Sequence, residues 1–442
     1  MKPYASMCGS LALVVSLVSA RQLLAQTDYV TPNGSAAPAA DQPAWPWQLV
    51  EAAARSLPPE GGTVSIAPGL YREAFTLDQP VVLTAPSGST TIGSVSDVTR
   101  STTFTLLNWN LHLFGDVALD TLPAWKDSER ADGVGSYLAI HRSELDYVAL
   151  CEVWDEDMFY GGDGASGIFN ISGYQYQQTF TDIRGGLTVC GVDTPFGAAG
   201  VPSPRWMHSG LAIMSDFAMS DLDKTHYEEC DGSCPTADSP DCLASKGFMG
   251  STVSKGGFTI RVYSTHTQAA EGTDAVRARE SQIAQLADTI AAYRSTHPSH
   301  VVIALGDFNV IGELWDRYDY FRDKFGSIGG LDAARNAPDQ VIYDRPGGPR
   351  WAAGYSLMKN NELATYFDKK TEDQRLDYIW YFPSLDGKAH IQPAKVRVLQ
   401  EVRGRELSGT GYVPLGTWPS LTSSQLSDHY PIQATFRIDY VP

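Results

Sequence analysis

Five short polar signatures occur in a fixed order along this chain, and they constrain its fold more than any other feature. They are Asn108-Trp109-Asn110, Cys151-Glu152-Val153-Trp154-Asp155, Ser264-Thr265-His266-Thr267-Gln268, Gly306-Asp307-Phe308-Asn309 and Ser427-Asp428-His429-Tyr430-Pro431. Apolar runs typical of buried strands precede the first four, at 104–107, 147–150, 258–263 and 301–305. Because each signature begins where a strand is expected to end, we expect the polar side chains to gather at one edge of a sheet.

The candidate functional residues in these signatures are carboxylates, amides and imidazoles. They are Glu152, Asp307, Asp428, Asn110, Asn309, His266 and His429. Carboxylate and amide oxygens are the ligands that hard divalent cations prefer, and imidazoles carry out proton transfer near neutral pH. The set therefore indicates metal-assisted cleavage of a phosphodiester.

The order and spacing of the signatures resemble those of the endonuclease/exonuclease/phosphatase superfamily, and within it the neutral sphingomyelinases. The resemblance extends over about residues 101–442. It implies that Asn110, Glu152 and Asp428 hold Mg²⁺, for which Mn²⁺ or Co²⁺ could substitute. It also implies hydrolysis of sphingomyelin or a related phospholipid at a membrane surface, with release of a phosphorylated head group.

Roles for the remaining polar residues also come from the resemblance. Asp307 and Asn309 would bind the phosphate and orient the attacking water, and His429 would be the general base. His266 matches the second histidine of the family, and Asp377 matches the carboxylate that orients the base. A single histidine or aspartate at a strand end is commonly structural, so it is the combination in family order that indicates catalysis.

Two finer motifs favour the sphingomyelinase subgroup. Thr265-His266-Thr267-Gln268-Ala269 is similar to the sphingomyelinase pattern Thr-His-x-Gln-Ala. The segment 241–247 resembles an Asp-x-Leu-Ala-x-Lys-Gly pattern of neutral sphingomyelinases, which places Asp241 and Lys246 in the active-site region. An ordinary surface ion pair is the alternative for these two residues.

The catalytic region alternates expected strands with expected helices, at 133–143 and 274–296. Apolar residues in the second helix recur at helical spacing, so that stripe is expected to face the core. Periodicity alone indicates an α/β or α+β fold. The family resemblance implies a four-layer α/β/β/α sandwich of two mixed sheets, with a small N-terminal β-rich module.

The chain divides into three expected parts. Residues 1–25 read as a cleaved signal peptide, because a short apolar run follows Lys2 and ends at small residues. Residues 26–99 combine a linker with short β-like runs that resemble one coil of a β-helix, and residues 100–442 form the catalytic domain. A secreted or periplasmic monomer is expected.

The charge of the chain bears on its partners. The formal net charge is −18, with an isoelectric point near 4.8. Proteins that bind nucleic acid stably use a basic surface to neutralise phosphates, so we expect no stable nucleic-acid partner. A secreted metal-dependent nuclease of the same superfamily remains the alternative, since metal ions could neutralise the contact. An inactive scaffold that only binds a partner is disfavoured by the intact candidate residues.

The cysteines are consistent with an oxidising compartment. Cys151 lies within an expected strand and is predicted to be a buried free thiol. Cys190, Cys230, Cys234 and Cys242 are predicted to form two disulfides. A zinc site using Cys230 and Cys234 is the alternative, but no second close pair completes it.

A segment at 404–426 precedes the last signature and is rich in Gly, Ser, Thr and Pro. We expect a loop or hairpin beside the active site, in which Trp418 contacts the membrane, as an exposed aromatic hairpin does in bacterial sphingomyelinases. Aromatic rings suit the membrane interface because they tolerate both water and lipid. The alternative is that Trp418 packs beneath the loop.

Overall fold

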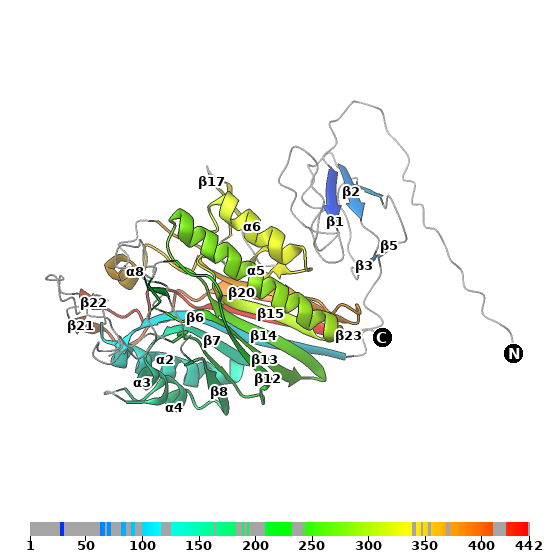
Figure 1. Ribbon diagram of the computed structural model, residues 1–442. Helices are drawn as coiled ribbons and strands as arrows, with labels where there is room; N and C mark the ends of the chain where they lie inside the picture. The colour runs from blue at the N-terminus through cyan, green and yellow to red at the C-terminus, as the bar shows by residue number, and fades with distance from the viewer. Residues whose placement is uncertain are drawn as a thin grey trace, which may run out of the picture.

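Two six-stranded sheets lie face to face in the computed structural model (Figure 1). The first has the order β20 (Ala389–Val398), β23 (Ile432–Tyr440), β6 (Arg100–Leu113), β7 (Tyr147–Val153), β11 (Ala212–Ser215) and β8 (Tyr176–Thr179). The second has the order β12 (Ser220–His226), β13 (Gly247–Lys255), β14 (Phe258–His266), β15 (Val301–Asp307), β19 (Asp377–Phe382) and β16 (Leu331–Asp332). Each sheet contains one parallel pair, β6 with β7 and β14 with β15, and is therefore mixed.

The structure describes residues 100–115, 125–162, 165–182, 208–231, 244–337, 355–367, 372–409 and 421–440, position 241 and several short strands. Among the short strands, β1 (Thr27–Val30), β2 (Gly62–Ile66) and β4 (Val81–Thr84) pair in parallel, as do β3 (Gly69–Tyr71) and β5 (Thr90–Ile92). The expected signal peptide at 1–25 lies outside the described residues, so the proposed division into three parts remains a prediction. In the part of the chain that is described, no helix has both the length and the hydrophobicity that a membrane crossing requires.

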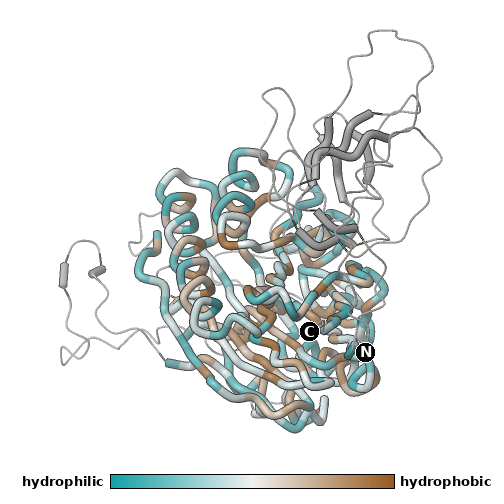
Figure 2. The backbone as a smooth tube through the Cα atoms, turned by 90° about the vertical axis from the view of Figure 1, so that its right-hand side faces the viewer, coloured by the Kyte–Doolittle hydropathy of each residue, from teal (hydrophilic) through white to brown (hydrophobic). Residues whose placement is uncertain are grey.

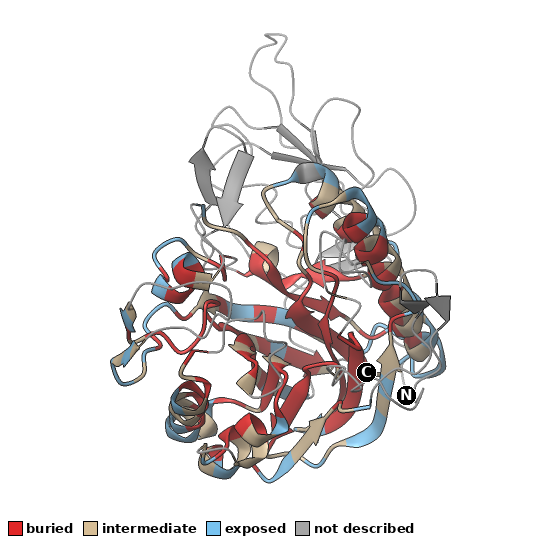
Figure 3. Ribbon diagram, turned by 60° about the vertical axis from the view of Figure 1, so that its left-hand side comes forward, coloured by how far each residue is buried: buried red, intermediate tan, exposed pale blue. Residues whose placement is uncertain are grey.

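Apolar side chains at every second position of the strands fill the space between the two sheets. Phe104 and Leu106 of β6 pack against residues of the second sheet such as Ile303, while Leu107 and Trp109 face the opposite side. This is the period of two that a pleated strand imposes on its side chains. The inter-sheet core is the buried centre of the molecule in Figure 3.

Helices cover the outer face of each sheet. The first sheet carries α2 (Asp127–His141), α3 (Glu156–Tyr160) and α4 (Ile168–Ser172), and the second carries α5 (Thr273–Thr296) and α6 (Trp315–Gly326). Hydrophilic and hydrophobic residues alternate around the turns of these helices in Figure 2, as expected for helices with one buried face. The predicted four-layer α/β/β/α sandwich is confirmed.

Helix α2 begins at Asp127, earlier than the predicted start at position 133. Gly133 and Gly135 suggest a helix boundary, yet both lie inside α2, where close packing uses their lack of a side chain. A Cβ at Gly133 would lie 2.6 Å from the side chain of Leu426, and one at Gly135 would lie 2.8 Å from Ile171. The glycines therefore let α2 approach its neighbours rather than end it.

Candidate active site

Strand pairing places the candidate residues next to one another. In the second sheet His266 lies opposite Asp307, and Asp307 lies opposite Asp377. In the first sheet Asn110 lies opposite Cys151, the neighbour of Glu152 in sequence. Glu152, His266 and Asp307 lie at or next to the last residues of their strands, and Asp377 is the first residue of β19. Strand β6 continues beyond Asn110 to Leu113 through an irregularity in its register. The site is thus built from the facing ends of both sheets.

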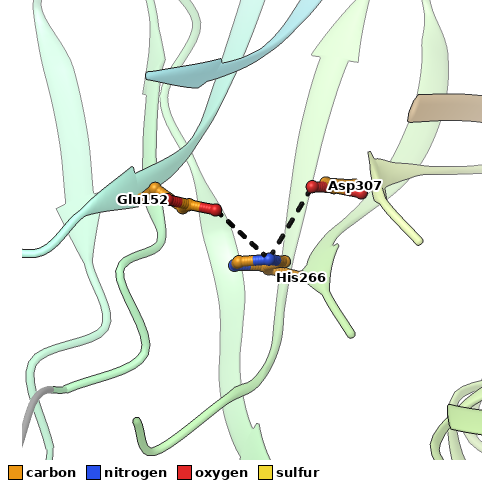
Figure 4. Close-up of side chains that lie close together, drawn as sticks. All are labelled: Glu152, His266 and Asp307. Carbon is orange, nitrogen blue, oxygen red and sulfur yellow. Dashed lines mark ion pairs between the residues drawn. The ribbon is translucent and has the colours of Figure 1, made fainter. Parts of the chain in front are cut away.

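Asn110 joins carboxylates from the two sheets. Its Nδ2 donates to Glu152 Oε1 and to Asp307 Oδ2, each at 2.9 Å. His266 Nε2 lies 3.7 Å from the same two carboxylate oxygens, as Figure 4 shows. Two carboxylates from separate strands therefore converge on one point.

The donor set at this point suits a hard divalent cation. Ligand atoms of Glu152, His266 and Asp307 lie within 4.8 Å of one another, and so do those of a second group, Asp307, Asp377 and His429. Buried carboxylates that converge require positive charge or strong hydrogen-bond donors to offset their burial. The amide of Asn110 supplies donors here, and its rotation would offer an oxygen to a cation instead.

Backbone strain is concentrated at this site. Glu152, Asn309 and His112 have φ values of 55°, 50° and 50°, in the left-handed region that residues with a side chain seldom adopt. Such conformations persist where surrounding contacts hold them, and they cluster at functional sites. For Asn309 the holding contacts are its own N–H bond to Asp307 Oδ1 at 2.9 Å and its Nδ2 bond to the Thr267 carbonyl at 3.1 Å.

Asp377 holds the imidazole of His429 in one orientation. His429 Nδ1 donates to Asp377 Oδ2 at 2.7 Å, and the other carboxylate oxygen accepts from Asn108 Nδ2 at 2.8 Å. Trp109 Nε1 donates to the His429 carbonyl at 2.9 Å. Burial disfavours the imidazolium, but the carboxylates of Asp377 and Asp428 outweigh it and raise the pKa of His429 well above its ordinary value. Because Nδ1 is engaged, Nε2 is the nitrogen available for proton exchange with a substrate.

Lys246 contacts the second histidine directly. Its Nζ lies 3.1 Å from His266 Nε2, 2.8 Å from Asp241 Oδ2 and 2.9 Å from the Thr267 carbonyl. Burial and the adjacent charge of Lys246 lower the pKa of His266 to about 4. His266 is therefore neutral at physiological pH, with Nε2 as an acceptor. The pair formed by Asp241 and Lys246 lies in the site and is not an ordinary surface ion pair.

Asp428 uses its two oxygens differently. Oδ1 accepts from Ser427 Oγ and from the His429 N–H, each at 3.0 Å. Oδ2 lies 3.6 Å from Nδ1 of His112, a residue that sequence reasoning missed. A signal was present, because Asn108, Asn110 and His112 alternate along β6 and therefore share one face of the strand.

Arg130 of α2 is a second residue that the sequence did not reveal. Its guanidinium is fully buried and donates to the carbonyls of Trp125, Leu111, Leu426 and His112, and to Asp127 Oδ1. These contacts use all five N–H donors that a guanidinium has. They connect the end of β6, which follows Asn110, to the segment that precedes Asp428.

The family of the chain follows from comparison with known proteins. Residues 107–429 match the sequence profile of the Endonuclease/Exonuclease/phosphatase family, and the match includes Asn110, Glu152, Asp307 and His429. The chain belongs to this family. This membership in the endonuclease/exonuclease/phosphatase family confirms the resemblance from which the site residues were chosen.

Several individual relatives are named sphingomyelinase C. The chain is 28% identical to one from Leptospira interrogans over 321 residues, which is 71% of this chain and 48% of the relative. It is 23% identical to one from Bacillus cereus over 79% of this chain and 93% of the relative. The chain spans less than half the length of the Leptospira interrogans relatives that it matches.

A solved structure in the same fold is beta toxin from Staphylococcus aureus, determined with bound magnesium ions. The TM-score is 0.51 and the sequence identity is 20%, with 77% of this chain and 100% of that chain covered. At this identity the likeness establishes the fold of the endonuclease/exonuclease/phosphatase domain.

Other predicted residues fall outside the described part of the chain. Trp418 is one of them, although β21 (Leu407–Gly409) and β22 (Leu421–Ser423) pair antiparallel on either side of it, as a hairpin requires. Cys151 is free and buried, as predicted. Cys230 is disulfide-bonded. Cys190, Cys234 and Cys242 are outside the described residues, so the two predicted disulfides stay a prediction.

Proposed function

We propose that the chain is a secreted, divalent-metal-dependent phosphodiesterase that hydrolyses sphingomyelin or a related phospholipid and releases a phosphorylated head group. One observation carries the proposal. The carboxylates of Glu152 and Asp307 converge through Asn110 beside the buried pair of Asp377 and His429. This places a hard-cation site next to an oriented imidazole, which is what hydrolysis of a phosphodiester requires.

The substrate class is supported by the relatives. Those from Leptospira interrogans and Bacillus cereus are both named sphingomyelinase C, and the match to the second extends over 93% of its length. The acidic character of the chain, with a net charge of −18, favours a lipid substrate over a nucleic acid.

The residues of the site have complementary roles in the proposed reaction. A water gives a proton to His429 Nε2 while its oxygen forms a bond to phosphorus, and the bond from phosphorus to the lipid oxygen breaks. Asp377 fixes the imidazole through Nδ1, at 2.7 Å. Asp307 and Asn309 orient the attacking water against the phosphate. The departing lipid oxygen takes up a proton from solvent and His429 Nε2 returns its proton to solvent, so the reaction consumes one water and the imidazole regains its starting form.

Asn110, Glu152, Asp307 and Asp428 would hold the metal, and we propose Mg²⁺ as the physiological ion. A divalent ion there would offset the charge that develops on the phosphoryl oxygens and would favour the neutral form of His429. Bound magnesium in the structure of beta toxin supports this choice. His266, which is neutral and contacts Lys246 Nζ, would stabilise the phosphoryl group from the side opposite His429.

We further propose how the protein meets its substrate. Residues 1–25 act as a signal peptide and the chain works outside the cytoplasm as a monomer. The hairpin whose base is formed by β21 and β22 carries Trp418 to the membrane surface. Aromatic side chains anchor proteins at this interface.

Side-by-side assays test the proposed function. Mature protein is offered liposomal sphingomyelin, liposomal phosphatidylcholine and plasmid DNA, each with Mg²⁺ and with a chelator. Metal-dependent release of phosphocholine from sphingomyelin supports the proposal. Cleavage of the plasmid alone would replace it with the nuclease alternative, and turnover that persists in chelator would contradict the metal site.

A further inference from the structure

Arg279 of α5 binds the loop that leads out of the active site. Its guanidinium is buried, and Nη1 donates to the carbonyls of Gln268 at 3.0 Å and Ala270 at 2.8 Å. Its Nη2 donates to Glu271 Oε1 at 2.6 Å. All three acceptors belong to the loop between β14 and α5. One side chain therefore holds this loop over the first turns of the helix.

Both main-chain polar groups of Gln268 are bound by side chains of α5. Gln268 is fully buried, so bulk water does not satisfy its N–H and its carbonyl. The N–H donates to Gln282 Oε1 at 2.7 Å, and the carbonyl accepts from Arg279. Arg279 and Gln282 are three positions apart and therefore lie on one face of the helix. This face of α5 fixes the backbone two residues after His266.

The loop is held in a strained conformation. Ala270 has a φ of 69°, in the left-handed region that residues with a side chain seldom adopt. Such a conformation persists where surrounding contacts hold it. The hydrogen bond from Arg279 to the Ala270 carbonyl is one of these contacts. Without the guanidinium, we expect the loop to relax away from this conformation.

The same loop is bonded to the residues around His266. The Ala269 N–H donates to Asp241 Oδ2, and this oxygen also accepts from Lys246 Nζ at 2.8 Å. Lys246 Nζ in turn lies 3.1 Å from His266 Nε2. A shift of Ala269 would therefore move the carboxylate that holds the ammonium group against the imidazole.

A second connection runs through Thr267, the residue before Gln268. Its carbonyl accepts from Lys246 Nζ at 2.9 Å and from Asn309 Nδ2 at 3.1 Å. The carbonyl of Thr267 and the N–H of Gln268 belong to one planar peptide group. The hold of α5 on Gln268 therefore also fixes the carbonyl to which Lys246 and Asn309 are bonded.

We propose that Arg279 is a positioning residue, which holds the loop after β14 so that Lys246 and Asn309 keep their places in the active site. The inference rests on the proposed function and adds to it a residue that acts through others. Arginine suits this task because its planar fork binds two carbonyls and a carboxylate in fixed directions, whereas lysine offers a single point charge.

The variant Arg279→Ala tests the proposal. Glu271 is exposed and also faces Arg317, so removal of the guanidinium leaves no buried unpaired carboxylate in this loop. On a soluble short-chain analogue at saturating Mg²⁺, we expect kcat to fall about 10- to 100-fold and KM to change less than about threefold, because reacting groups are misplaced. Arg279→Lys keeps a charge but not the fork, and its kcat should fall less, by about three- to tenfold.

Arg294→Ala is the matched control. Arg294 is buried in the same helix and also donates to two main-chain carbonyls, those of Ile328 and Pro383. Pro383 follows β19 at the end opposite Asp377, away from the site. Arg294→Ala should lower the melting temperature and keep kcat within about twofold of the unaltered protein.

All variants are assayed well below their melting temperatures. A normal kcat in Arg279→Ala, or equal falls in kcat in Arg279→Ala and Arg294→Ala, would overturn the inference. Should Arg279→Ala fail to fold, a normal kcat in Arg279→Lys overturns it in the same way. If the unaltered protein shows no metal-dependent hydrolysis of phospholipid, the proposed function fails instead.

Discussion

His429 Nδ1 and Asp377 Oδ2 are 2.7 Å apart in a buried ion pair that links two separate segments of the chain. Asp377 begins β19 in the second sheet, while His429 lies three positions before the start of β23 in the first. The pair therefore spans the two sheets at the site. The orientation of the imidazole depends on how these sheets pack, and not on a local turn.

Replacement of Asp377 by Asn should reduce kcat by about 100-fold or more, because the imidazole loses the carboxylate that fixes its tautomer. The amide keeps the size of the side chain, and the hydrogen bond from Asn108 can still be accepted by its oxygen. Steady-state kinetics on a soluble substrate analogue measures the effect. A kcat within a few-fold of normal would remove Asp377 from the orienting role.

Replacement of Glu152 by Gln should abolish turnover while the melting temperature stays close to normal, because a charged ligand is lost and the shape is retained. Glu152 is partly buried, and this desolvation opposes ionisation, but hydrogen bonding from His112 and Asn110 holds its pKa well below the usual range. Metal titrations of activity and of melting temperature provide the measurement. Normal activity at saturating Mg²⁺ would contradict the assignment of Glu152 as a ligand.

Replacement of Arg130 by Met should lower the free energy of unfolding by about 3–5 kcal/mol, because the buried carboxylate of Asp127 loses its cationic partner. Arg322→Met is the control, since Arg322 pairs with Asp319 and Asp323 at the surface and its loss should cost less than about 1 kcal/mol. Urea denaturation of both variants gives the comparison. Equal losses of unfolding free energy in the two variants would show that the hydrogen bonds of the Arg130 guanidinium to the end of β6 and to Leu426 do not stabilise the fold.

Asp332 should make stability depend on acidity. Burial opposes its ionisation, but Arg375 Nη2 at 2.7 Å and further hydrogen bonding lower its pKa below the ordinary value. A carboxyl with a lowered folded-state pKa stabilises the protein above its unfolded pKa, about 3.9, and the stabilisation is lost as the pH falls through the folded value.

Asp332→Asn should therefore lower the melting temperature at pH 7 and leave a smaller difference from the unaltered protein as the pH falls below about 3.9. Asp386→Asn serves as the control, because Asp386 is exposed and its carboxylate accepts from Ser384 Oγ and the Lys388 N–H in its own turn. Thermal unfolding at several pH values gives the profile. A difference in melting temperature between Asp332→Asn and the unaltered protein that stays constant with pH would show that the charge of Asp332 does not stabilise the fold.

Replacement of Trp418 by Ala should lower hydrolysis of liposomal substrate much more than hydrolysis of a soluble short-chain analogue, since an interfacial contact matters only at a membrane. Paired assays with the two substrates test this. Equal losses on both, or a large fall in melting temperature, would show that Trp418 is structural.

The strands and the two long helices of the catalytic region could be predicted from periodicity. The helix expected at 274–296 is α5 (Thr273–Thr296), and the strands before Glu152 and Asp307 occur where apolar runs predicted them. The residues that converge were chosen by family order, and the structure brings Asn110, Glu152 and Asp307 together. Local pattern predicts where each strand ends, whereas the contact of Asn110 with Asp307, 197 positions away, depends on how the two sheets pack.

The roles of Asn108 and Arg130 could not be identified in the same way, because they arise from contacts between distant segments. Arg130 resembles any arginine on a helix, and only tertiary packing brings the Leu426 carbonyl to it, 296 positions away in the sequence. Lys246 acquires its role when β13 and β14 pair and carry it to His266. Such relationships follow from sheet packing, which periodicity does not encode.

The position of β23 has a consequence for biosynthesis. This strand inserts between β20 and β6, and the motif just before it brings His429 to Trp109, 320 positions earlier in the chain. A nascent or unfolded precursor that has not yet docked β23 therefore lacks in its site both His429, the proposed general base, and Asp428, a proposed metal ligand. Long-range pairing of this kind forms late, because the chain between the strands must first be ordered. Under the proposed function, phosphodiesterase activity would therefore appear only after β23 has docked and the fold is complete.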